Sequence, residues 1–143
     1  MAELRERTIA RGVALQALYE KDLSTHPLSV ILSERIKSID LDEGQTEFMK
    51  EIATGVVENE NIIDSFIEKY ASEWPINQIA VIDRNIIRIS VWEFAIKGDT
   101  PVKVAINEAV ELAKKFGSDS SQRFVNGVLG SLADHIDDIK AAI

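Results

Sequence analysis

The residues of this sequence best suited to binding chemistry are three arginines near its N-terminus, Arg5, Arg7 and Arg11. A guanidinium group can pair bidentately with phosphate and can stack on a base. Gln16 and Tyr19 follow within the same predicted helix, and an aromatic ring such as that of Tyr19 can stack on an unpaired base. The sequence therefore presents a candidate nucleic-acid-binding segment at its start.

Two observations weaken this interpretation when each segment is considered alone. Residues 1–12 carry a net charge of only +1, because Glu3 and Glu6 offset the three arginines. A second candidate, the pair Arg123-Phe124 behind a serine-rich loop, is explained as well by a phenylalanine packed in the core. Charge and aromatic content by themselves thus favour a solvated helix start and a core phenylalanine.

Residues able to carry out catalysis or hold a cofactor are few. The chain has no cysteine and two histidines, His26 and His135, and it lacks the glycine-rich and paired-histidine motifs of nucleotide and zinc sites. His135 lies among three aspartates, which are better explained as a solvated helix face than as metal ligands. Glu108 and Glu111 lie about one turn apart, as on any acidic helix, and no cleft is indicated around them. We therefore expect no enzyme, no cofactor and no metal site.

The composition indicates one globular domain. The chain has 143 residues, of which 45% are hydrophobic and 28% charged, and a chain of this length can bury a self-sufficient core. Its net charge of −8 is concentrated in residues 34–73, which hold 11 acidic and 4 basic residues, so a basic patch elsewhere is compatible with the negative total. No apolar run approaches the ~20 residues that cross a bilayer, and the polar start does not resemble a signal peptide. We expect a cytoplasmic protein without membrane contact.

Apolar residues recur at intervals of three and four along nearly the whole chain, which predicts an all-helical fold of about six to seven helices. The segment 79–96 is rich in isoleucine, but its length and period favour a central, heavily buried helix over a strand. Residues 42–70 form either one long helix or two helices that divide near residues 58–61. The predicted helices span about 4–23, 27–36, 42–70, 79–96, 101–116 and 121–136.

Two of these helices carry recognisable end signals. Thr100 is expected to cap a helix that begins at Pro101, since proline at the first helical position loses no hydrogen bond. Lys114 and Lys115 fall in the last turn of that helix, where positive charge is favourable. Gly117 is expected to follow as its C-terminal cap.

Four stretches, in order along the chain, resemble the NusB family of bacterial transcription antitermination factors. The first is ARGVALQALY at residues 10–19, and the second is IDRNIIRISVWEF at residues 82–94. The most specific is PVKVAINEAVELAKKFG at residues 101–117, followed by RFVNGVL at residues 123–129. Together these motifs extend over most of the chain, so the resemblance concerns the whole domain.

The resemblance implies a compact helical bundle in which a subdomain of about residues 1–75 packs against one of about 76–143. It implies a protein that binds boxA RNA of ribosomal RNA leader transcripts together with the ribosomal protein NusE. With other Nus factors and RNA polymerase, such proteins suppress termination and catalyse no reaction. Recognition of single-stranded RNA of this kind suits phosphate contacts combined with stacked bases.

The resemblance also assigns residues to the two binding surfaces. Its RNA-binding positions fall on Arg5, Arg7, Arg11, Gln16, Tyr19, Arg123 and Phe124. For NusE we expect a surface around the central helix and its exit, at Asp83, Arg88, Lys97 and Lys103. The acidic residues 34–73 are expected to face away from the RNA, because like charge near phosphate lowers affinity.

One departure from the family pattern keeps a second interpretation open. Members often have consecutive arginines at the N-terminus, whereas Thr8 and Ile9 separate Arg7 from Arg11 here. Fewer phosphate contacts lower the intrinsic RNA affinity and increase dependence on the partner. The alternative is a helical protein-interaction module of the same fold without RNA affinity, and a homodimer is also possible. A fused RNA methyltransferase is not expected, because 143 residues leave no room for its cofactor-binding domain.

Overall fold

Helices build the described part of the chain, as the sequence predicts. The computed structural model describes residues 2–71, 73 and 75–143, with residues 2–4 described by their backbone alone. Its α-helices are α1 (Ala2–Leu23), α2 (Leu28–Ser38), α3 (Glu43–Glu58), α4 (Glu60–Tyr70), α5 (Val81–Val91), α6 (Val102–Phe116), α7 (Ser121–Ala133) and α8 (Ile136–Ala141). A 3-10 turn, η1 (Ile76–Gln78), precedes α5, and a π-helical turn, η2 (Trp92–Lys97), follows it. No described helix is both long and apolar enough to cross a membrane.

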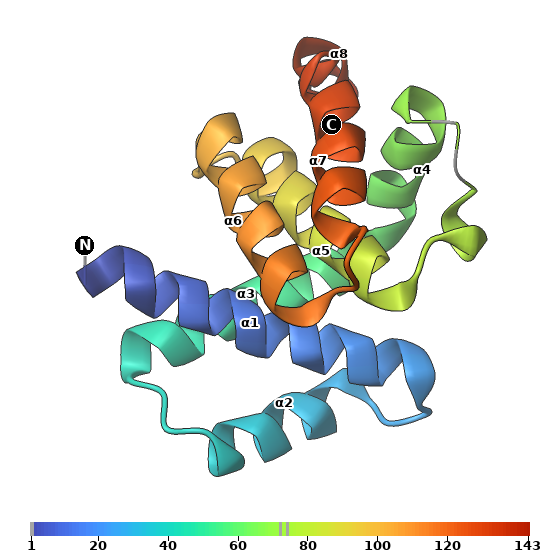
Figure 1. Cartoon of the computed structure of the whole chain (residues 1–143). Helices are drawn as coiled ribbons and strands as arrows, with labels where there is room; N and C mark the ends of the chain where they lie inside the picture. Colours follow the sequence, from blue (N-terminus) through green and yellow to red (C-terminus); the bar gives the residue numbers. More distant parts are fainter. Residues whose placement is uncertain (1, 72, 74) are drawn as a thin grey trace.

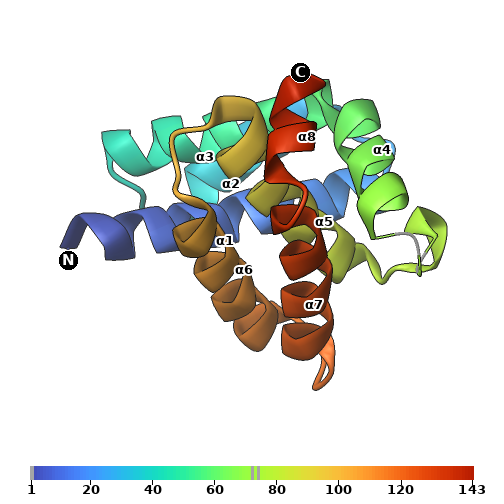
Figure 2. The ribbon, with the colours of Figure 1, turned by 90° about the horizontal axis from the view of Figure 1, so that it is seen from above.

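Helix α5 occupies the centre of the molecule. It contacts α1, α3 and α4 from the N-terminal half and α6 and α7 from the C-terminal half (Figure 1). The long helix α1 packs against α2 and α3 on one side, while α6 and α7 form an antiparallel pair on the other (Figures 1 and 2). The apolar side chains of both halves belong to one continuous core, which extends across the predicted subdomain boundary near residue 75. The prediction of a buried central helix is confirmed.

A glycine allows α3 and η2 to approach each other closely. A Cβ atom on Gly55 would lie 2.2 Å from the indole nitrogen of Trp92, so only a residue without a side chain fits under the ring. The Trp92 side chain is buried there. Packing at this point joins the two halves of the chain through the core.

The segment 42–70 forms two helices, one of the two predicted alternatives, and they divide at Asn59, whose side-chain amide donates a 2.7 Å hydrogen bond to the Gly55 carbonyl. Two other helix boundaries differ from the predictions. The predicted helix 79–96 widens into the π-helical turn and ends at Gly98, which has a left-handed φ of 77°. The last predicted helix stops at Ala133, and α8 continues after a two-residue break.

Both predicted caps of α6 are wrong in their mechanism. The Thr100 hydroxyl makes no cap bond and instead donates a 3.0 Å hydrogen bond to Glu93. Gly117 has extended backbone, with φ of −90°, rather than the left-handed conformation of a glycine cap. Space explains this glycine, because a Cβ would lie 2.8 Å from the Ala113 carbonyl oxygen.

Candidate nucleic-acid interface

Helix α1 separates its N-terminal arginines onto two faces. Arg5 is exposed and lies one helical turn before Ile9, which lines a hollow together with Ile39 and Phe116. Arg7 is exposed on the opposite face, where its guanidinium carbon lies 4.6 Å from the centroid of the Phe48 ring on α3. Helical spacing places Arg11 one turn beyond Arg7, also toward Phe48. The three arginines therefore do not form one patch.

The structure buries Arg11, which corrects the prediction that it contacts phosphate. Its side chain is 3% exposed. Its Nε and Nη2 atoms donate hydrogen bonds of 2.8 and 2.7 Å to the two carboxylate oxygens of Glu93, and Nη1 lies 3.4 Å from Glu108. Thr8 and Thr100 donate further bonds to these carboxylates. Arg11 thus ties α1 to η2 and α6 and presents no guanidinium to a ligand.

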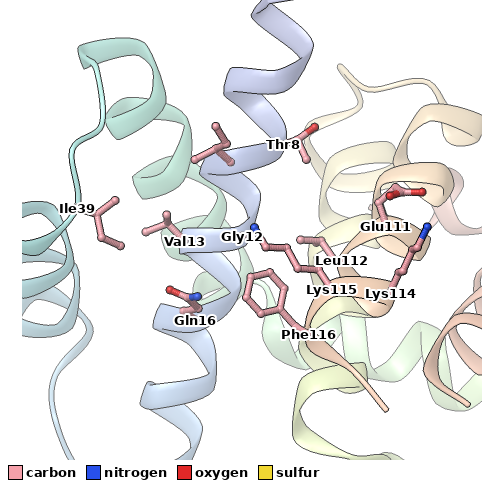
Figure 3. Close-up of a pocket in the computed structure, with 11 residues that line it drawn as sticks. Thr8, Gly12, Val13, Gln16, Ile39, Glu111, Leu112, Lys114, Lys115 and Phe116 are labelled. Atoms are coloured by element: carbon pink, nitrogen blue, oxygen red, sulfur yellow. The ribbon is translucent and has the colours of Figure 1, made fainter. Parts of the chain in front are cut away.

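Gln16 and Tyr19 remain on the outer face of α1. The side-chain oxygen of Gln16 accepts a 3.1 Å hydrogen bond from Arg35, and the residue lines a hollow of about 500 Å³ between α1 and α6 (Figure 3). Tyr19 is 39% exposed. It lines a second hollow of about 320 Å³, together with Asp83 and Phe116.

Arg123 and Phe124 lie in the first turn of α7 and line two more hollows. One, of about 410 Å³, is also lined by Asp83 and by Gln78 of η1. The other, of about 340 Å³, extends to Tyr70 at the end of α4. Arg123 is exposed at this helix N-terminus, where the backbone dipole favours a bound phosphate. Phosphate and base contacts can therefore both be made at this end.

These four hollows form one row because neighbours share their walls. Phe116 lines both the hollow at Gln16 and the hollow at Tyr19. Asp83 lines both the hollow at Tyr19 and the hollow between η1 and Arg123. We call the row the α1–α7 surface and define it by Gln16, Tyr19, Asp83, Phe116, Arg123 and Phe124. It joins helices that are about 100 residues apart in sequence.

Arg88, predicted for partner binding, is buried and held by carboxylates. It is 4% exposed, and its guanidinium donates bonds of 2.9 and 2.8 Å to Asp64 and of 3.2 Å to Asp22. Burial by itself would lower the pKa of Arg88, but the hydrogen bonds and charge of Asp64, with the charges of Glu60 and Asp22, outweigh it and raise the pKa. This corrects the prediction for Arg88, which joins α1, α4 and α5 in the interior.

The other predicted partner-binding residues do not lie together. Asp83 belongs to the α1–α7 surface, in the first turn of α5. Lys97 is at the far end of the same helical run, where it forms ion pairs with Glu51 and Asp99. Lys103 is exposed in the first turn of α6. The loop between Lys97 and Lys103 is therefore separate from Asp83.

Lys115 is exposed and Phe116 is half-buried, and the sequence did not single out either as a binding residue. The helix dipole accounted for the lysine, and the phenylalanine was given no role. A signal was present in the sequence, since Lys115-Phe116 repeats the cation–phenylalanine order of Arg123-Phe124. Both pairs lie at the ends of helices that meet in the α6–α7 loop.

Comparison of the sequence with known proteins points to one family throughout. The model of the NusB family matches residues 8–134. A transcription antitermination protein NusB of Dehalococcoides mccartyi is 44% identical over 92% of both chains, and one of Bacillus cereus is 39% identical over 90% of this chain and 98% of its own.

Solved structures also match along most of the chain. T. maritima NusB has a TM-score of 0.81 and 32% identity, with 96% of this chain and 97% of that chain covered. A chain from the complex of antitermination factors NusB and NusE with double-stranded RNA has a TM-score of 0.79 and 28% identity, covering 97% of this chain and 98% of its own.

Proposed function

Because the chain belongs to the NusB family, we propose that it is a transcription antitermination factor that binds boxA RNA of ribosomal RNA leader transcripts together with NusE. By this binding it suppresses termination by RNA polymerase. Contacts with other Nus factors, a cytoplasmic location and pairing of two copies of the chain are parts of the same proposal. Its role is to bind and assemble, without catalysis.

The α1–α7 surface is the observation that supports RNA binding most strongly. It combines the exposed ring of Tyr19 with Arg123 at a helix N-terminus. Arg123 forms no ion pair with a carboxylate of the described residues, whereas the buried Arg11 and Arg88 are both paired. A cation without an acidic partner is available to a phosphate.

The distribution of negative charge agrees with this placement. Of the acidic residues in 34–73, all of which the structure describes, Glu73 alone lines a hollow of the α1–α7 surface. Most of the others lie on α2, α3 and α4. RNA on the α1–α7 surface would thus avoid most of the repulsion from this segment.

The hollows and rings favour unpaired bases over a duplex. Stacking requires a base that has left its pair, and a shallow row of hollows beside aromatic side chains suits such bases. Burial of Arg11 removes one cation from the predicted RNA contacts. We therefore propose modest intrinsic affinity for single-stranded RNA and a strong dependence on NusE.

Fluorescence anisotropy with a boxA-like single-stranded RNA tests the proposal, with and without NusE, at two salt concentrations. We expect salt-sensitive binding that tightens when NusE is added. Arg123→Gln should reduce the slope of log affinity against log salt by about 0.7, the value for one phosphate contact on a single strand. Lys50→Gln, an equal charge change at an exposed position on α3, should leave the slope unchanged. Absence of RNA binding even with NusE would contradict the proposal and favour a protein-interaction module.

A further inference from the structure

The hollow between α1 and α6 combines apolar walls with three charged residues of α6, Glu111, Lys114 and Lys115. Its walls include Ile9 and Val13 from α1, Ile39 from the segment after α2, and Leu112 and Phe116 from α6. Its volume of about 500 Å³ is within the range of small-ligand sites. Figure 3 shows it extending across α1, with Ile39 on one side and Phe116 on the other.

Gly12 lets the aromatic ring of Phe116 form one wall of this hollow. A Cβ on Gly12 would lie 3.4 Å from the ring, so a longer side chain would occupy the space beside it. Phe116 also lines the adjoining hollow at Tyr19. The Phe116 ring therefore lines the α1–α7 surface beside Gly12, where α1 has no side chain.

Lys115 places a positive charge at the same wall. Its Nζ lies 5.3 Å from the centroid of the Phe116 ring, and its side chain extends from α6 toward Gly12 (Figure 3). It forms no ion pair with a carboxylate of the described residues, although the chain has a net charge of −8. The ligand chemistry that this combination fits is a flat aromatic group joined to an anion, which is the chemistry of a nucleotide.

Resting on the proposed function, we propose that this hollow binds one further nucleotide of the RNA, with its base against Phe116 and its phosphate at Lys115. The hollow continues the row of the α1–α7 surface beyond Tyr19. It also leads toward Arg5, which lies on the same face of α1 one turn before Ile9. The RNA path thus extends from α7 across α6 to the start of α1.

A scan of abasic RNAs tests this assignment. Each RNA is the boxA-like strand with one base removed, and its affinity is measured with NusE for the wild type, Lys115→Gln and Phe116→Leu. At one position, loss of the base should weaken wild-type binding on the order of tenfold, as expected for one stacked base, and should weaken Phe116→Leu very little. At the other positions both proteins should lose equally. Lys115→Gln should lower the salt slope by about 0.7.

Controls separate a contact from an effect on folding. Lys140→Gln makes the same charge change in the last turn of α8, outside the hollows, and should leave RNA binding unchanged. Thermal unfolding monitors each variant, and Lys115, which is exposed, keeps the test valid if Phe116→Leu folds poorly.

Three results would overturn the inference. Equal losses at every RNA position in wild type and Phe116→Leu, with an unchanged salt slope in Lys115→Gln, would leave the lysine as a helix-end charge only. If Lys115→Gln and Phe116→Leu bound RNA normally without NusE, but NusE no longer increased their RNA affinity, the hollow would be assigned to a protein segment. Absence of wild-type binding to the intact RNA would overturn the proposed function as well.

Discussion

Replacing Arg11 distinguishes a structural arginine from an RNA-binding one. We expect Arg11→Ala to destabilise the fold, because the Arg11 side chain is enclosed between α1, η2 and α6. Both Arg11 and its partner Glu93 are 2% exposed, and two hydrogen bonds of 2.7 and 2.8 Å join them. Without the guanidinium, the Thr100 hydroxyl would be the remaining hydrogen-bond donor to Glu93 among the described side chains.

The expected loss is large because a charge would remain buried. Removing one partner of a buried ion pair costs about 3–5 kcal/mol of unfolding free energy, and most of this is the cost of the unpaired charge. Arg7→Ala is the matched control. Arg7 is exposed and contacts the Phe48 ring at 4.6 Å, a cation–π contact that contributes about 0.5–1 kcal/mol. The two substitutions should therefore differ by at least about 2 kcal/mol.

Urea denaturation followed by circular dichroism measures this difference, and RNA affinity is measured at a temperature where each variant is folded. The double variant Arg11→Met with Glu93→Leu should regain much of the stability, because neither charge is then buried. If Arg11→Ala proved as stable as Arg7→Ala while losing RNA affinity, Arg11 would be a phosphate contact and the structural argument would be refuted.

Three further results follow from the packing and the ion pairs. Gly55→Ala should lower the melting temperature in calorimetry, because the added methyl carbon would lie 2.2 Å from the indole nitrogen of Trp92 and overpacking costs about 1–3 kcal/mol. Gly130→Ala is the control, since an added methyl group there meets open space. Equal melting temperatures of the two variants would disprove this prediction. Asp64→Asn should lower the unfolding free energy measured in urea by about 1.5–3 kcal/mol, because Asp64 accepts two hydrogen bonds from Arg88. Glu58→Gln, at an exposed position, should change neither stability nor RNA affinity. Similar losses of stability in both variants would contradict the pairing of Asp64 with Arg88. The raised pKa of Arg88 means that its stabilising contribution is complete below the ordinary arginine pKa and is lost only as the pH rises through the higher folded value. The stability difference between wild type and Arg88→Met should thus stay constant between about pH 7 and 10, and a decrease with pH would count against it.

Helix positions were predictable because their signals are local. Pro27 and Pro101 immediately precede α2 and α6, and Gly98 ends the central helical run with a left-handed φ. The break between α7 and α8 was not predictable in the same way. Asp134 and His135 include no proline or glycine, so the sequence contains no strong helix-breaking residue there.

The environment of the charged residues could not be predicted, because their partners are distant in sequence. Arg11 pairs with Glu93, 82 positions away, and Lys97 pairs with Glu51, 46 positions away. An arginine looks the same in sequence whether it faces solvent or a buried carboxylate. Family resemblance predicted RNA contacts for Tyr19 and Arg123, which are both exposed, but it could not show that Asp83 lies between them.

The most direct test of the α1–α7 surface is an amide ¹H–¹⁵N NMR titration of the chain with boxA-like single-stranded RNA. We predict that the largest shift changes occur at Gly12, Gln16 and Tyr19 on α1 and in the first turn of α7. Amides of the acidic helices α2 and α3 should change little. Largest changes on α3, with α1 and α7 unaffected, would contradict the account and place the RNA on the opposite side of the molecule.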